Sequence, residues 1–220
     1  MPSVKIPRKS TDTDMTPFVD VAFLILSFFM LATKFKPPEP VEITTPNSVS
    51  TIKLGEHDAI LVAMDPKGRV FFDFMPKDAP GQSKKYDLIK NINQGRNLGL
   101  TEAEMREFAK PGPVGVPFAN LKQVLSGQAA NAATWPGIPV KDSASNELVY
   151  WIRDAVTLLA GSQVDYMIKG DNGSKYPDFK NVLEAFKRND IYKFKLVTMP
   201  EEAPAGSPLE HERATGKATE

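Results

Sequence analysis

One aspartate lies inside a long apolar run near the N-terminus, and its carboxyl group is the side chain in this sequence best suited to carry a proton. Asp20 falls within residues 15–35, where most of the other residues are hydrophobic. A charged side chain near the membrane centre costs at least about 2.5 kcal/mol. Because burial disfavours the charged form, an enclosed aspartate can exchange a proton near neutral pH. We therefore expect Asp20 to face protein or water and to act in proton translocation.

Three polar residues share one face of the helix that residues 15–35 predict. Thr16, Asp20 and Ser27 are separated by four and seven positions, which places them on one stripe of a helix. Such a stripe argues for partner helices that enclose Asp20, with Thr16 and Ser27 supporting the same channel face. Thr16 is a favourable N-cap, and Pro17 suits the first helical position and marks the helix start. The alternative is that Asp20 lies near the headgroups and makes only a helix-start contact.

The length of the apolar run predicts a single transmembrane helix. Its 21 residues would extend about 31 Å, close to the ~30 Å thickness of a membrane hydrocarbon core. A cleaved signal peptide is the alternative, since Lys5, Arg8 and Lys9 precede the run. An internal aspartate and the ending LATKFKPP are atypical of that class. Charge alone does not decide the orientation, because the cations on the two sides differ little in number.

Composition and motifs exclude several classes of function. The 27 basic and 27 acidic residues cancel, so no basic surface for nucleic acid is indicated. Cysteine is absent, and the two histidines, His57 and His211, are isolated in sequence, which argues against thiol chemistry and a metal site. Phosphate-binding loops and nucleophile elbows are also missing. We therefore expect a protein that is not an enzyme and that has no metal and no organic cofactor.

The rest of the chain predicts a small α+β domain after a linker. Residues 36–53 are rich in proline, which favours an extended spacer. Within residues 54–199, two β-rich runs are joined by Asp65-Pro66-Lys67-Gly68, a sequence suited to a tight hairpin turn. A helix over 146–161, a strand, a second helix over 176–190 and a final strand follow. The predicted order is β-β-α-β-α-β.

The two predicted helices each have an apolar face. We expect Asn146 to cap the first helix and Gly161 to end it. Trp151 falls on the apolar face and is therefore a core residue rather than a platform for carbohydrate. The residues expected to face the core are Leu148, Trp151, Ile152, Ala155 and Leu159 of the first helix, and Phe179, Val182, Leu183 and Phe186 of the second.

The order D-x-T-P-F-V-D-V, followed by an apolar run that ends in F-M-L-A, resembles the single transmembrane helix of the ExbD/TolR family. Thr16, Pro17 and Asp20 match the T-P-x-x-D core of that family. The segment YMIKGDNGSKYPDFKNVLEAFKRNDIYKFKLVTM is similar to its periplasmic domain. The resemblance implies that Asp20 is the proton carrier, that residues 1–14 are a cytoplasmic leader, and that the α+β domain lies in the periplasm beyond the inner membrane.

The resemblance also implies the partners and the coupling ion. Two copies of the chain would sit inside a ring of an ExbB/TolQ-like channel subunit, and the periplasmic domain would engage a TonB-like energy transducer. Protons would be the coupling ion, and no cofactor is implied. A TolR-like role with a domain that holds peptidoglycan is one alternative. A membrane-anchored periplasmic binding or scaffold protein without ion flux is another.

Residues 75–145 depart from the common family pattern, which has a short connection there. They contain three predicted helices, in KKYDLIKNI, TEAEMREFAK and FANLKQVLSG, and Thr101 and Glu104 have the spacing of a capping box. We expect an insertion that packs beside the domain, with a partner-binding addition as the alternative. The lysines at 84, 85 and 90 indicate a solvated face. Residues 200–220 lack apolar periodicity, which predicts a disordered tail.

Overall fold

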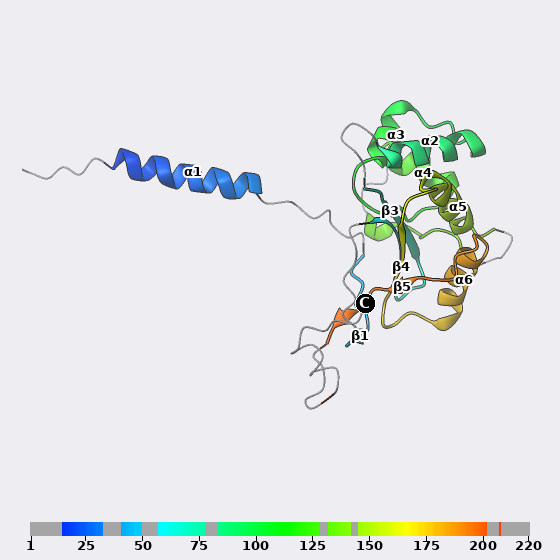
Figure 1. Ribbon diagram of the computed structural model, residues 1–220. Helices are drawn as coiled ribbons and strands as arrows, with labels where there is room; N and C mark the ends of the chain where they lie inside the picture. The colour runs from blue at the N-terminus through cyan, green and yellow to red at the C-terminus, as the bar shows by residue number, and fades with distance from the viewer. Residues whose placement is uncertain are drawn as a thin grey trace, which may run out of the picture. The chain divides into compact units, whose positions relative to one another are not determined.

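The computed structural model describes residues 15–32, 41–49, 57–77, 83–127, 132–141, 145–201 and 207. The chain divides into two compact units, Met1–Pro37 and Pro38–Glu220. The first unit contains helix α1 (Thr16–Ala32), and the second contains every other described helix and strand (Figure 1). The predicted leader, residues 1–14, lies outside the described residues, as does most of the predicted tail.

A four-stranded mixed sheet forms the centre of the second unit. Its strands are β2 (Asp58–Met64), β3 (Val70–Met75), β4 (Val164–Gly170) and β5 (Lys195–Leu196), in the order β3-β2-β4-β5. Strands β2 and β3 form an antiparallel hairpin, whereas β4 runs parallel to β2 and β5 runs parallel to β4. Helices α5 (Leu148–Leu158) and α6 (Tyr176–Lys187) connect the parallel strands. The predicted β-β-α-β-α-β order is confirmed for these six elements.

The hairpin turn is made by the residues that the sequence indicates. The amide of Gly68 donates to the carbonyl oxygen of Asp65 over 3.0 Å, and Gly68 has a φ of 75°, which glycine adopts readily. The Asp65 carboxylate oxygen Oδ1 accepts from the amides of Lys67 and Arg69 over 2.9 and 2.8 Å. The turn is therefore held by an aspartate side chain as well as by its backbone.

One face of the sheet packs against helices. All five residues predicted for the apolar face of α5 are buried, and on α6 Val182 and Phe186 are buried while Phe179 and Leu183 pack at the edge of the same core. Figure 1 shows α5 and α6 on one side of the sheet. The Asn146 side-chain oxygen accepts from the amide of Leu148 over 3.1 Å. The predicted apolar faces are confirmed, but the N-cap of α5 is Glu147, so Asn146 lies one residue before the predicted cap position.

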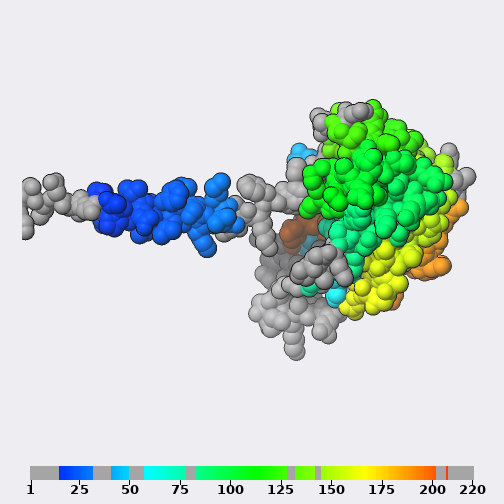
Figure 2. Space-filling view, turned by 90° about the horizontal axis from the view of Figure 1, so that it is seen from above, coloured from blue at the N-terminus to red at the C-terminus, as the bar shows by residue number. Residues whose placement is uncertain are grey.

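Residues 75–145 form three helices, as the sequence predicts. They are α2 (Lys84–Arg96), α3 (Glu102–Phe108) and α4 (Phe118–Leu125), followed by a short 3-10 turn at Ala132–Thr134. The capping box of α3 is present, because the amide of Glu104 donates to Thr101 Oγ1 over 3.3 Å and the amide of Thr101 donates to Glu104 Oε2 over 2.7 Å. Figure 2 shows these helices, in green, as one continuous face of the second unit.

The loops around these helices also bind the outer edge of β3. Phe72 and Val114 exchange two backbone hydrogen bonds of 2.8 Å, and the amide of Ile138 donates to the carbonyl oxygen of Val70 over 2.8 Å. Edge strands carry unpaired backbone groups that invite association with other chains. Along this part of β3 the chain satisfies those groups itself, so the segments around Val114 and Ile138 are part of the domain's hydrogen-bonded structure.

Part of the range assigned to the linker lies against the domain. Ile43 and Thr45 are buried. The amide of Thr44 donates to Asp171 Oδ2, and the amide of Asn172 donates to the carbonyl oxygen of Thr44, each over 2.8 Å. Strand β1 (Asn47–Ser48) then pairs in parallel with β6 (Met199–Pro200). Residues 43–48 are therefore anchored at two places, which a proline-rich composition alone does not predict.

Candidate functional site

Helix α1 carries the sequence-predicted site. The Met15 carbonyl oxygen accepts from the amides of Phe18 and Val19, each over 3.1 Å, and the helix begins at Thr16. The start is one residue earlier than expected, so Pro17 is the second helical residue rather than the first. Proline is compatible with this position, because amides in the first turn have no acceptor within the helix. Asp20 lies one turn further along.

The helix brings the three predicted polar residues onto one face. At 100° per residue, Thr16, Asp20 and Ser27 lie within about 40° of one another around the axis, and Asp20 and Ser27 are about 10 Å apart along it. The Ser27 hydroxyl donates to the carbonyl oxygen of Leu24 over 2.9 Å. Because the Ser27 hydroxyl donates its proton within its own helix, it can act only as a hydrogen-bond acceptor toward a further group on the Asp20 face.

The remaining surface of α1 is apolar and exposed. Its large hydrophobic side chains have exposed fractions from 52% at Ile25 to 88% at Leu31, so they require a covering of protein or lipid. The 17 residues of α1 extend about 26 Å. Among the described residues, no helix is both long enough and apolar enough to cross a membrane. The expected span of residues 15–35 continues at 33–35, which lie outside the described residues.

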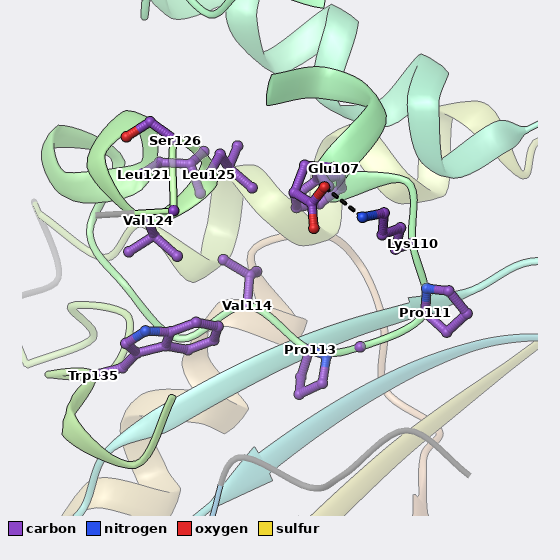
Figure 3. A pocket seen from close by; sticks show the side chains of 13 residues that line it. Glu107, Lys110, Pro111, Pro113, Val114, Leu121, Val124, Leu125, Ser126 and Trp135 are labelled. Carbon is purple, nitrogen blue, oxygen red and sulfur yellow. Dashed lines mark hydrogen bonds and ion pairs between the residues drawn. The ribbon is translucent and has the colours of Figure 1, made fainter. Parts of the chain in front are cut away.

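The second unit contains a pocket of about 610 Å³ within residues 75–145. The end of α3, helix α4, the loop 110–114 and the side chain of Trp135 surround it, and Figure 3 shows Val114, Val124 and Trp135 converging on it. Glu107 and Lys110 form an ion pair of 2.6 Å at its rim. Most of its lining is apolar, so it is suited to binding and not to acid–base chemistry.

The walls of this pocket are tied to the hairpin by two cations. Arg69 Nη1 donates to the carbonyl oxygens of Ala133 and Trp135 over 2.7 and 2.9 Å. Its Nε donates to the Asp65 carboxylate over 2.6 Å. Lys85 Nζ donates to the carbonyl oxygen of Gly112 over 2.6 Å. The backbone at Ala133 and Trp135 and the loop at Gly112 are therefore held in place by side-chain donors.

Lys85 corrects one sequence prediction. The lysines at 84, 85 and 90 were expected on a solvated face, but Lys85 is buried and lies 3.4 Å from the Asp73 carboxylate. Burial lowers the pKa of its ammonium group, and the attraction of Asp73 opposes that effect. The prediction is wrong for Lys85 because Asp73 and Gly112, distant in sequence, supply the acceptors that a buried ammonium requires.

Within the described residues, no group of three histidine, cysteine, aspartate or glutamate side chains is arranged to hold a metal ion. His57 lies near a single carboxylate, with its Nδ1 3.8 Å from Asp165 Oδ2. His211 lies outside the described residues.

Comparison with known proteins gives one match. The model of the family described as biopolymer transport protein ExbD/TolR matches residues 7–201 of the chain. No curated protein and no solved structure matched. The matched range includes α1 with Asp20, the mixed sheet and residues 75–145.

Proposed function

Since the chain belongs to the ExbD/TolR family of biopolymer transport proteins, whose members are subunits of motors that energise transport, we propose that it is the proton-carrying subunit of an ExbB–ExbD-like channel. In this proposal the motor uses the proton motive force to energise TonB-dependent transport across the outer membrane. The chain itself is not an enzyme and uses no cofactor, with protons as the coupling ion.

The observation that carries the proposal is the placement of Asp20. It is the only charged residue of α1, and it stands on the same face as Thr16 and Ser27 while the rest of the helix exposes apolar side chains. A carboxyl group on such a helix can exchange a proton only where protein or water reaches it, since lipid offers no acceptor for that proton, and partner helices that enclose Asp20 would supply such a site. The ExbD/TolR family associates with ExbB/TolQ-like proteins, which supply such helices.

The energy available to such a carrier is sufficient for conformational work. One elementary charge that crosses 100 mV is worth about 2.3 kcal/mol. Each pH unit across the membrane adds about 1.4 kcal/mol. A few protons passing through Asp20 would therefore supply enough free energy to drive a conformational step.

The proposed topology is a single pass through the inner membrane. Residues 1–14 lie in the cytoplasm and 15–35 span the membrane. Residues 36–53 form the linker, of which 43–48 are attached to the domain. Residues 54–199 form the periplasmic domain with 75–145 as its insertion, and a tail follows strand β6. The length of the apolar run and the apolar surface of α1 support this arrangement. A periplasm-dependent reporter fused after Glu201 should be active. Activity of a cytoplasm-dependent reporter at that position would reverse the orientation and remove the proton-carrier role.

The proposed partners are two copies of this chain within a ring of an ExbB/TolQ-like subunit, and a TonB-like transducer that contacts the periplasmic domain. A TolR-like subunit that serves envelope integrity and holds peptidoglycan is the second candidate, because the family includes both. Loss of the chain distinguishes the two roles. A loss of TonB-dependent uptake supports the ExbD-like role, whereas a defect in envelope integrity supports the TolR-like role. A membrane-anchored scaffold without ion flux would tolerate replacement of residues 15–35 by an unrelated anchor, whereas a motor subunit would not.

The test is Asp20→Asn in the full chain, produced together with its channel partner. Asparagine keeps the size and hydrogen bonding of aspartate but cannot release a proton. We expect the variant to insert and to copurify with the partner in normal amount while transducer-dependent uptake is lost. Asp20→Glu, which keeps the titratable group, should retain part of the activity. Normal assembly with normal uptake in Asp20→Asn would refute the proton-carrier role.

A further inference from the structure

The guanidinium group of Arg96, the last residue of α2, lies between two aromatic rings. Its Cζ is 4.4 Å from the centroid of the Phe118 ring and 3.8 Å from that of the Tyr150 ring. These rings come from α4 and α5, so three helices fix the plane of one cation. Phe118 is buried and also stacks on Trp151, with ring centroids 5.1 Å apart. The sandwich is therefore anchored in the hydrophobic core.

The hydrogen-bonding capacity of this guanidinium is not used by the protein. Arginine carries five N–H donors and no acceptor. Arg69, Arg106 and Arg153 each donate to a carboxylate. Arg96 Nε is buried and has no hydrogen-bond partner, and among the described residues no acceptor receives a hydrogen bond from the rest of its guanidinium. A cation this firmly positioned would ordinarily have an acceptor, because an unpaired buried donor costs about 1–3 kcal/mol.

The carboxylate of Glu147 is influenced by the charge of Arg96, but it is already engaged elsewhere. Its Oε2 accepts from the amide of Phe118 at the start of α4 over 2.8 Å. Burial raises the pKa of Glu147, while the amide hydrogen bond and the charge of Arg96 act in the opposite direction. Glu147 interacts with Arg96 through space and forms no ion pair with it. The charge of Arg96 therefore remains available to a further anion.

We propose that Arg96, held between Phe118 and Tyr150, binds the carboxylate of an acidic side chain on a partner protein. The rings cover both faces of the guanidinium, so a ligand can approach only at its edge, where the planar fork of donors matches a planar carboxylate. One cation beside Glu147 balances a monoanion better than a phosphate dianion, which Glu147 would repel. Arg96 lies outside the three pockets described by their linings, and a carboxylate carried on a protein surface can reach a cation that no such pocket encloses. This site goes beyond the proposed function and does not depend on Asp20.

The test uses the full chain in detergent micelles, with the guanidinium nitrogens of arginine observed by NMR. The probes are two neutral-capped tripeptides, acetyl-Ala-Glu-Ala-amide and acetyl-Ala-Gln-Ala-amide, which differ only in the carboxylate. We expect a saturable change in the Arg96 nitrogen and proton shifts with the glutamate peptide and no saturable change with the glutamine peptide. Through-bond assignment identifies Arg96, so the comparison requires no variant to fold.

Controls distinguish this site from general attraction of anions. Arg106, which is 75% exposed on α3, should show only the small, non-saturable change that sodium chloride of equal ionic strength produces. Arg96→Lys keeps the charge but lacks the planar fork of donors. In this variant, the change that the glutamate peptide causes in the ring signals of Tyr150 and Phe118 should be at least tenfold weaker. Equal responses to the two peptides, or equal responses of Arg96 and Arg106, would overturn the site. Saturation by inorganic phosphate at lower concentration than by the glutamate peptide would overturn the carboxylate assignment.

Discussion

Replacing Arg69 by methionine should release the wall of the pocket in residues 75–145 and destabilise the domain. Arg69 is the side chain that joins the hairpin turn to Trp135, because it bonds the Asp65 carboxylate and the carbonyl oxygens of Ala133 and Trp135. Methionine keeps an unbranched apolar stem of similar length but removes every one of these donors. The substitution therefore tests the polar contacts with little loss of packing.

The expected size of the effect follows from the burial of Asp65. Its carboxylate is 1% exposed, and breaking a buried ion pair by removing one partner typically costs about 3–5 kcal/mol. Two backbone amides continue to donate to Asp65 Oδ1, which favours the lower end, about 3 kcal/mol. That is a large part of the 5–15 kcal/mol that stabilises a typical domain. For a domain of this size it corresponds to a fall in Tm of about 6–12 °C.

The assay is urea unfolding of residues 41–201, followed by tryptophan fluorescence. Trp135 should also become more exposed to solvent in the folded variant, which would shift its emission to longer wavelength. Arg106→Met is the matched control, because the Arg106–Glu102 pair is exposed on both sides and exposed pairs contribute about 0–1 kcal/mol. If Arg69→Met and Arg106→Met lowered the free energy of unfolding equally, the Asp65–Arg69 contact could not be what fixes this wall.

The remaining predictions concern the domain and its backbone. A fragment of residues 41–201 should be soluble and folded without detergent, as circular dichroism and a cooperative urea transition would show; aggregation without detergent would contradict the division into two units. Gly95→Ala should stabilise the domain by about 0.5–1 kcal/mol, since Gly95 lies within α2 and, apart from its chain neighbours and the nearby backbone of α2, no atom lies within 4 Å of the new Cβ. Gly137→Ala should destabilise it by at least about 1–2 kcal/mol, because Gly137 has a φ of 86° and a Cβ there would lie 2.9 Å from the backbone nitrogen of Val70; thermal unfolding of both variants measures these opposite signs. Because burial raises the pKa of Glu147 above its ordinary 4.5, the folded state binds this proton more tightly than the unfolded state, so the stabilisation is complete below pH 4.5 and is lost as pH rises through the folded-state pKa. Glu147→Gln should therefore gain stability relative to the native chain as pH rises through that range, and a constant difference between the two urea midpoints from pH 4 to 8 would show that Glu147 is not perturbed.

Local pattern was sufficient to predict most of the secondary structure. The faces of α5 and α6, the turn at Asp65–Gly68 and the capping box at Thr101 depend on residues at most a few positions apart, so their spacing in sequence states their contacts directly. The stripe on α1 that contains Asp20 is local in the same sense. The enclosure of Asp20 by partner helices depends on other chains, so it remains a prediction. The start of α1 differed by one residue, a normal uncertainty at a helix end.

The sequence by itself determined the order of the strands and helices, the apolar run with a single carboxyl group, and the family resemblance, because each resides in short-range spacing of residue types. Only the tertiary structure decided that residues 43–48 bind Asp171 and the strand at Met199–Pro200, that Lys85 is buried, and that Arg96 lies between Phe118 and Tyr150. These contacts join residues from 12 positions apart, for Lys85 and Asp73, to 152 positions apart, for Asn47 and Met199. The sequence shows that a residue is charged but not whether its side chain is solvated or buried. Burial becomes favourable only when folding brings hydrogen-bond acceptors or aromatic rings next to the charged group.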